Sequence, residues 1–187
     1  QMRIWHENAK DLPVWGHFDV LVCGGGPAGI GAALRARRMG VRTMIFDRND
    51  CLGGLATAGM MSHWTGRSSS RLLKEIKARP NKVGEATFFA DEGKSGEWTV
   101  GDHVIATEAM KIVLDEMMTE AGVDILYYTP VCDTCLRDGK ICAVVVENKS
   151  GRGVLEADYV LDATGDGDVA AFAGVPYCLG RESDHKM

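Results

Sequence analysis

A chain of 187 residues that is 45% hydrophobic and 25% charged is long enough to form one domain with its own core, and its composition is that of a globular protein. The formal net charge of -5 argues against a nucleic-acid-binding function, which requires a basic face. No apolar run in the sequence approaches the roughly 18 residues of a membrane span. Residues 1–11 are polar and mixed in charge, unlike a signal peptide.

The cysteine content does not suggest a disulfide framework, because the chain is too long and its expected core too large to need one. We therefore expect a reducing, cytoplasmic compartment. The cysteines are Cys23, Cys51, Cys132, Cys135, Cys142 and Cys178.

Residues 18–47 have the pattern of a strand, a glycine-rich turn, a helix and a second strand. The run at residues 20–23 is wholly apolar, as expected for a strand buried on both faces of a parallel sheet. Residues 30–39 are rich in Ala, Leu and Arg and predict a helix that Gly40 ends. A second apolar run, residues 43–46, is followed by the carboxylate of Asp47.

The turn between strand and helix matches G-x-G-x-x-G through Gly24, Gly26 and Gly29. The first glycine permits a tight turn, the second lets a pyrophosphate approach the backbone, and the third lets the helix lie close to the strand. The helix N-terminus offers free N–H groups and a positive dipole end to a diphosphate. Asp47 lies about 20 residues downstream, where an acidic side chain accepts hydrogen bonds from a ribose. These features together predict a dinucleotide-binding site.

A second glycine-bearing loop follows Asp47, with Gly53 and Gly54 in the sequence GGLAT, and a late segment at residues 162–168 reads DATGDGD. With these segments the chain resembles the FAD-dependent oxidoreductases of the glutathione-reductase-like superfamily, in the branch that carries both sequences. The resemblance covers the chain from about His17 onward and implies FAD as the cofactor.

The resemblance also implies which residues bind FAD. The first loop would hold the diphosphate, Asp47 with Arg48 the adenosine ribose, and the second loop would run beside the diphosphate towards the flavin. Backbone atoms near Val131 would contact the adenine, and the late segment would flank the diphosphate from the opposite side. The implied cofactor-binding residues are Gly24, Gly25, Gly26, Pro27, Ala28, Gly29, Asp47, Arg48, Gly53, Gly54, Leu55, Ala56, Thr57, Val131, Ala163, Thr164, Gly165 and Asp166.

One departure from the superfamily pattern excludes thiol–disulfide chemistry of the kind that its disulfide reductases perform. Its disulfide reductases carry a redox-active cysteine pair just after the glycine pair, whereas residues 55–61 contain no cysteine. Cys51 is better explained as a small buried side chain than as a nucleophile. His63 is open to several interpretations: a proton carrier, a hydrogen-bond donor to the flavin or an attachment point, or, as we favour, a histidine hydrogen-bonded at a loop end. No catalytic residue can be named.

Residues 68–79 predict a short amphipathic helix that a serine caps and Pro80 ends. Residues 81–101 are polar and rich in glycine. The resemblance implies that this region leaves the FAD domain as an excursion towards the substrate side, and its sequence indicates no chemistry. Residues 107–121 predict a helix capped by Thr107, whose methionines recur at core spacing.

Gly122 should end this helix, and residues 123–128 predict a strand. Cys132 and Cys135 then form a C-x-x-C pattern, but turn residues on both sides of the run 141–146 indicate a β-hairpin rather than a helix N-terminus. Side chains at i and i+3 of a strand point to opposite faces. Zinc would need a second ligand pair, so we regard both cysteines as incidental.

The strand that ends at Asp162 leads into small residues, which allow the backbone to turn sharply at the carboxyl edge of a sheet, where ligands bind. The three aspartates of this segment, Asp162, Asp166 and Asp168, could suggest a site for a hard metal ion. Their spacing is not that of a calcium-binding loop, and a nucleotide-binding segment explains them better. We expect no metal. Residues 169–174 continue as a short apolar helix.

The expected fold is a single α/β Rossmann-like domain over residues 1–187, with a parallel sheet, a three-stranded antiparallel meander over residues 132–160 and flanking helices. Its core should comprise residues 17–61 and 102–178, with residues 62–101 as the excursion. The expected function is that of an oxidoreductase whose flavin accepts a hydride from a small-molecule substrate. The alternatives are an FAD-holding or electron-transfer subunit and an NAD(P)-binding dehydrogenase domain.

The resemblance implies a partner as well as a cofactor. Members of the superfamily continue into a substrate domain and return with a final Gly-Asp segment and a helix. We therefore expect a complementary chain or a C-terminal portion to complete the protein, in preference to a reduced domain that binds FAD alone. A small-molecule substrate is expected, and neither nucleic acid nor a membrane.

Overall fold

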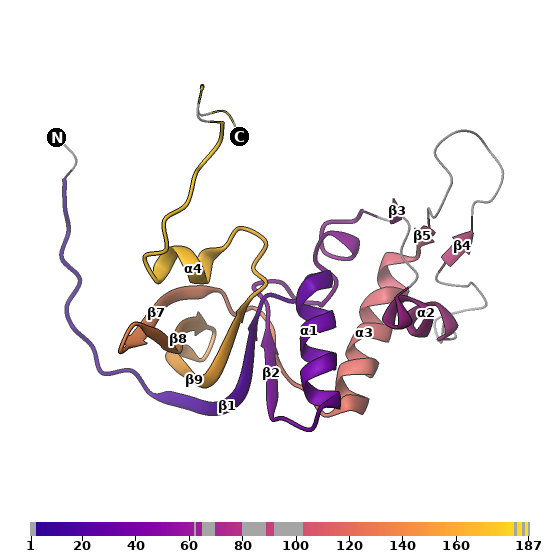
Figure 1. The fold of residues 1–187 in the computed structure, drawn as a ribbon, viewed down its shortest axis with the longest axis horizontal. Coiled ribbons are helices and arrows are strands. Elements are labelled where there is room, and N and C mark those ends of the chain that lie inside the picture. The colour runs from indigo at the N-terminus through magenta and orange to yellow at the C-terminus, as the bar shows by residue number, and fades with distance from the viewer. Residues whose placement is uncertain are drawn as a thin grey trace.

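A six-stranded sheet forms the centre of the computed structural model, which describes residues 3–61, 63–64, 70–79, 89–91, 103–181, 183–184 and 186 (Figure 1). Its first four strands in spatial order are parallel, and the last two continue it as an antiparallel meander. The expected α/β fold class is therefore confirmed. In order across the sheet, the strands are β6 (Asp124–Leu126), β2 (Thr43–Phe46), β1 (Val14–Cys23), β9 (Gly151–Asp162), β8 (Lys140–Asn148) and β7 (Val131–Arg137).

Helices flank this sheet on both sides. Helices α1 (Pro27–Arg38) and α3 (Thr107–Ala121) lie side by side on one face, and α4 (Asp168–Phe172) lies over β7 on the other side (Figure 1). The remaining elements are α2 (Arg71–Ala78), the short 3-10 helix η1 (Gly54–Ala56), and a small antiparallel sheet of β3 (His63–Trp64), β5 (His103–Ile105) and β4 (Phe89–Asp91). None of the helices in the described part of the chain is long and apolar enough to cross a membrane.

The sheet separates two hydrophobic cores. Side chains alternate along a strand, so neighbouring residues of β1 enter different layers. Val22 packs under α1 and α3 with the methionine stripe of α3, whereas Leu21 packs between the parallel strands and the meander. Both side chains are fully buried. This two-sided burial explains why residues 20–23 contain no polar side chain.

Strand β1 is longer than the apolar run at residues 20–23 predicted, and it begins before residue 17, where the core was expected to start. Val14 pairs with Val154 and His17 with Glu156, in parallel with β9. The backbone groups of this segment therefore find partners in a strand more than a hundred residues away, which no local pattern reveals.

Each predicted helix is present, but several boundaries differ from the prediction: α2 begins at Arg71 and not at residue 68, and α4 ends at Phe172 and not at residue 174. Helix α1 begins at Pro27, three residues before the expected start, because proline suits the first turn of a helix. Thr107 does not cap α3: it is the first helical residue, and the capping position belongs to Ala106, whose side chain makes no capping bond. Gly122 ends α3 in the left-handed conformation, as expected (φ 77°).

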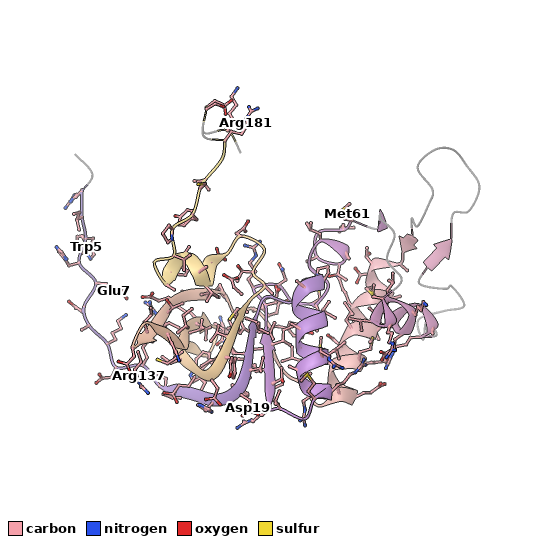
Figure 2. All side chains as sticks on the ribbon, in the orientation of Figure 1. Trp5, Glu7, Asp19, Met61, Arg137 and Arg181 are labelled. Atoms are coloured by element: carbon pink, nitrogen blue, oxygen red, sulfur yellow. The ribbon has the colours of Figure 1, made fainter. Side chains whose placement is uncertain are left out.

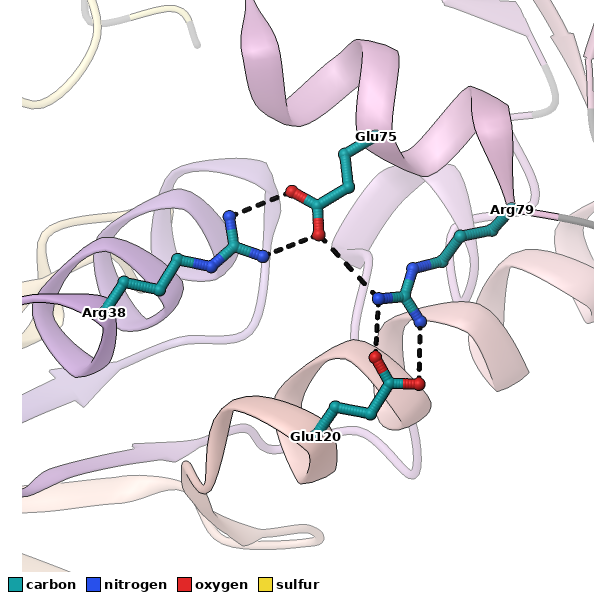
Figure 3. Close-up of polar contacts among 4 residues, drawn as sticks. All are labelled: Arg38, Glu75, Arg79 and Glu120. Carbon is teal, nitrogen blue, oxygen red and sulfur yellow. Dashed lines mark hydrogen bonds and ion pairs between the residues drawn. The ribbon is translucent and has the colours of Figure 1, made fainter.

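Helix α2 is fixed to α1 and α3 by a network of two arginines and two glutamates (Figure 3). Ser70 caps the helix by accepting a hydrogen bond from Leu73 N at 3.0 Å, as the sequence predicted. Arg38 on α1 donates two hydrogen bonds to Glu75, of 2.9 and 2.6 Å. Arg79 donates two to Glu120 on α3, of 3.0 and 2.6 Å, and lies 3.7 Å from Glu75. Pro80, the expected end of α2, lies outside the described residues.

The glutamate at the centre of this network should contribute more than an isolated surface ion pair. Replacing Glu75 with Gln removes the charge that faces both Arg38 and Arg79, and we expect a loss of about 1 kcal/mol in the free energy of unfolding, measured by urea denaturation at low salt. The control is Glu108→Gln, which affects one i,i+3 pair with Lys111. Equal losses in the two variants would contradict the network.

Candidate dinucleotide-binding site

A cavity of about 650 Å³ opens at the carboxyl edge of β1, β2 and β9. Its volume lies within the range of small-molecule sites. The first loop and the late segment, far apart in the sequence, line it together, and so do the end of β2, the second loop and the residues that lead into β7. Of the predicted residues, those that line it are Gly24, Gly26, Pro27, Ala28, Asp47, Arg48, Gly54, Leu55, Val131, Ala163, Thr164, Gly165 and Asp166.

The first and last segments meet at Gly24. Its N–H donates to the carbonyl oxygen of Phe46 at 2.8 Å, and the N–H of Ala163 donates to that of Cys23 at 2.8 Å. The φ of Gly24 is +111°, and a Cβ atom here would collide with the carbonyl group of Ala163. Only glycine permits both this conformation and this approach.

The glycines near Gly24 have different structural roles. A Cβ atom at Gly29 would collide with the carbonyl oxygen of Gly24, so Gly29 serves the close packing of helix on strand. A Cβ atom at Gly25 would lie 2.6 Å from the side chain of Leu52, in the interior. Gly26, by contrast, has no atom within 4 Å of its Cβ position. The open space in front of Gly26 and the N-terminus of α1 is where an anion can approach the backbone.

Three hydrogen bonds fix the carboxylate of Asp47, whose residue surface is only 7% exposed. One oxygen, Oδ2, accepts from Gly25 N at 2.5 Å. The other, Oδ1, accepts from the backbone N and the Nδ2 of Asn49 at 2.7 and 2.8 Å. The carboxylate thus joins the first loop to the end of β2 while it lines the cavity. Oδ2 can still accept from a ligand hydroxyl, because a carboxylate offers about four lone-pair positions and these three hydrogen bonds leave one of them, on Oδ2.

The turn after β9 is held by Asp162 and Thr164. Asp162 Oδ1 accepts from Thr164 N and Oγ1 at 3.1 and 2.8 Å, and its Oδ2 accepts from Ala170 N at 3.0 Å. Thr164 Oγ1 accepts in turn from Gly167 N and Asp168 N at 3.1 and 2.9 Å. Asp162 therefore builds the turn into α4. Within the described ranges, no group of three or more His, Cys, Asp or Glu side chains is placed to hold a metal ion.

Several predicted residues do not line the cavity but shape the loops that do. Gly53 N donates to Gly25 O at 2.8 Å, which ties the second loop to the first. Thr57 is fully buried and its hydroxyl donates to Leu52 O at 2.6 Å, while Ala56 packs in the helix-side core. The residues in this group are Gly25, Gly29, Gly53, Ala56 and Thr57.

Other lining residues were not predicted. Asn49 could have been suspected, because Asn two residues after a strand-end Asp is suited to bond that carboxylate. Thr129 and Pro130 carried no local signal, since their position depends on how β6 joins the sheet. The unpredicted lining residues are Phe46, Asn49, Ala58, Gly59, Thr129, Pro130 and Asp168.

The C-x-x-C cysteines lie within β7, in agreement with the hairpin prediction. Burial raises the pKa of the thiols of Cys132 and Cys135, so neither has the stabilised thiolate of a redox site. Burial and, second, the charge of Asp162 raise the pKa of Cys23. Burial also raises the pKa of Cys51. His63 lies in β3, but its side chain lies outside the described residues.

Thiol labelling tests this assignment. At pH 8, iodoacetamide should modify the exposed Cys178 in the native protein, while the buried Cys23 reacts at least about tenfold more slowly because the thiolate is the reactive form. Peptide mass spectrometry after timed quenching measures both rates, with urea-unfolded protein as the control. Equal native rates would contradict the burial of Cys23.

Comparison with known proteins agrees with the geometry. The model of the family "FAD dependent oxidoreductase" matches residues 19–187. The thiamine thiazole synthase of Aeropyrum pernix is 30% identical over 161 residues, 79% of this chain and 54% of that protein. The thiamine thiazole synthase of Methanococcus aeolicus is 29% identical over 177 residues, 90% of this chain and 60% of that protein. The chain thus spans little more than half the length of these curated relatives.

Solved structures share the fold. Thermovibrio ammonificans THI4 superposes with a TM-score of 0.64 at 22% identity, over 89% of this chain and 66% of that chain. A geranylgeranyl bacteriochlorophyll reductase-like protein from Thermoplasma acidophilum gives 0.63 at 22% identity, over 88% and 44%. At these identities the likeness concerns the fold. With the family match over most of its length, this chain belongs to the FAD dependent oxidoreductase family, and its cofactor is FAD.

Proposed function

We propose that this chain is the FAD-binding part of an oxidoreductase of the glutathione-reductase-like superfamily, in which a small-molecule substrate is oxidised. The observation that carries the proposal is the convergence of residues 24–28 and 163–166 on one cavity. FAD, when bound, supplies hydride acceptance and electron transfer. The residues of this chain bind and orient it.

Successive parts of the cavity suit the diphosphate, the adenosine ribose and the flavin of a bound FAD. The Cβ-free space at Gly26, before the N-terminus of α1, suits the diphosphate. Asp47 suits the adenosine ribose at one end. At the other end Leu55 lines the cavity, and it and the nearby Met61, labelled in Figure 2, are exposed apolar side chains next to which a flavin ring would lie.

Two alternatives are weaker. An NADP-specific site is disfavoured because the carboxylate of Asp47 would repel a 2′-phosphate. NAD would use the first loop and Asp47, but the wall formed by Gly54 and residues 163–166 extends the cavity beyond them. Thiamine thiazole synthesis is the second candidate function, supported by the 30% identity to the enzyme of Aeropyrum pernix.

The glycine loop offers a direct test. Gly26 has an extended backbone (φ -70°, ψ -178°) and free space at its Cβ, so Gly26→Ala should fold normally. The added methyl occupies the space proposed for the diphosphate, and we expect at least about tenfold weaker FAD binding, a loss of about 1.4 kcal/mol, by isothermal titration calorimetry.

The matched control is Gly31→Ala in α1, whose methyl would lie 3.9 Å from Leu72 and fits. That variant should bind FAD like the unmodified protein. Parallel titrations with NAD distinguish the alternatives. Unchanged FAD affinity in Gly26→Ala, or preference for NAD over FAD, would overturn the proposed site.

We also propose a complementary polypeptide at β9. β8 pairs with β9 only as far as Glu156, whereas β1 pairs with it to Asp162, so in the described part of the chain no strand pairs with the other edge of residues 157–162. Tyr159 and Leu161 are paired with Val20 and Val22 of β1, but are 72% and 41% exposed. An open strand edge beside uncovered apolar side chains is suited to a further strand.

The occupant we propose is polypeptide that supplies the length by which the curated relatives exceed this chain. In native material from the source cells, we expect more polypeptide than 20.2 kDa, and slower amide hydrogen exchange at residues 157–162 than in the isolated chain. A 20.2 kDa protein that turns over substrate alone would contradict this proposal.

A further inference from the structure

The connection between β6 and β7 forms one wall of the cavity, through Thr129, Pro130 and Val131. We call residues 127–131 the adenosine corner, because they lie beside Asp47. Tyr128 adopts a left-handed backbone (φ 52°), unusual for a non-glycine residue, and Thr129 is completely buried. A buried hydroxyl in a strained connection must be held by specific partners.

The corner is attached to the end of β2 by its backbone. Tyr128 N donates to Asn49 O at 3.0 Å, and Thr129 N donates to Asp47 O at 2.9 Å. The same two residues, Asp47 and Asn49, share the carboxylate hydrogen bonds described above. The position of the corner is therefore coupled to the acid proposed to bind the ribose.

The side chain of Thr129 is attached to a third element. Its Oγ1 donates to Tyr127 O at 2.7 Å and accepts from Asn148 Nδ2 at 3.1 Å. Asn148 ends β8, and its Oδ1 accepts from Ser150 N at 2.8 Å in the turn to β9. Nearby, Glu147 N donates to Pro130 O at 3.4 Å. Asn148 thus joins the meander to the corner, 19 residues away in sequence.

We propose that Asn148 is a positioning residue for the adenosine end of the bound dinucleotide. It does not line the cavity itself. Its amide holds the hydroxyl of Thr129, and so holds the cavity wall at residues 129–131 in register with Asp47. This inference rests on the proposed function and assigns a ligand-binding role to the turn between β8 and β9.

The variant Asn148→Asp distinguishes the contact of Asn148 with Thr129 from its contact with the turn between β8 and β9. The carboxylate can still accept from Ser150 N but cannot donate to Thr129, so the turn is kept and one hydrogen bond is lost. We expect about three- to tenfold weaker binding of FAD and ADP, a loss of about 0.7–1.4 kcal/mol, by calorimetry at 15 °C. Thr129→Val, which lacks the hydroxyl that Asn148 holds, should have a similar effect.

The double variant of Asn148→Asp and Thr129→Val should bind ADP no more weakly than Thr129→Val alone, because both remove the same bond. Ser150→Ala is the control: its exposed side chain is not used, only its backbone N–H. A purely structural role would lower the melting temperature of Asn148→Asp and leave its ADP affinity unchanged, which overturns the inference alone. Binding of neither FAD nor ADP by the unmodified chain overturns the proposed function as well.

Discussion

The parallel pairing of β1 with β9 is the constraint on which the rest of the structure depends. It runs from Val14 and Val154 to Cys23 and Asp162, and so brings the ends of two strands, one early and one late in the chain, to the same edge of the sheet. The next residues, Gly24 and Ala163, are then so close that a side chain at Gly24 has no space. The cavity follows from this pairing. The chain turns away from the sheet after β1 and again after β9, and the residues of these two turns line the cavity between them.

Asp47 connects the cavity to the remaining layers. Its backbone carbonyl holds Thr129, and its carboxylate holds Gly25 and Asn49. A single residue at the end of β2 therefore determines the relative positions of the first loop and the adenosine corner. Such a residue is suited to orient a ligand because its own side chain is already fixed by hydrogen bonds before the ligand binds.

The features that were predicted from the sequence depend on local residue patterns, and those that were missed depend on how distant strands pair in the sheet. The strand, loop and helix around Gly24 were predicted because buried strands are apolar and G-x-G-x-x-G has a known mechanical basis. The hairpin between β7 and β8 was predicted because turn residues precede the apolar run at residues 141–146. Its turn residues, Asp138 and Gly139, both adopt left-handed backbones. The pairing of Val14 with Val154 and the lining role of Thr129 arise from contacts between distant segments. Thr107 illustrates a third limit, since a capping residue type next to a helix start need not occupy the capping position.

The central claim is that residues 24–28 and 163–166 contact one diphosphate from two sides. A crystal structure of the chain with ADP tests it most directly. The account predicts the diphosphate in front of Gly26, within hydrogen-bond distance of the first turn of α1, with Thr164 and Gly165 on its other side. A diphosphate bound elsewhere, or bound only by the first loop with the late segment turned away, would contradict it.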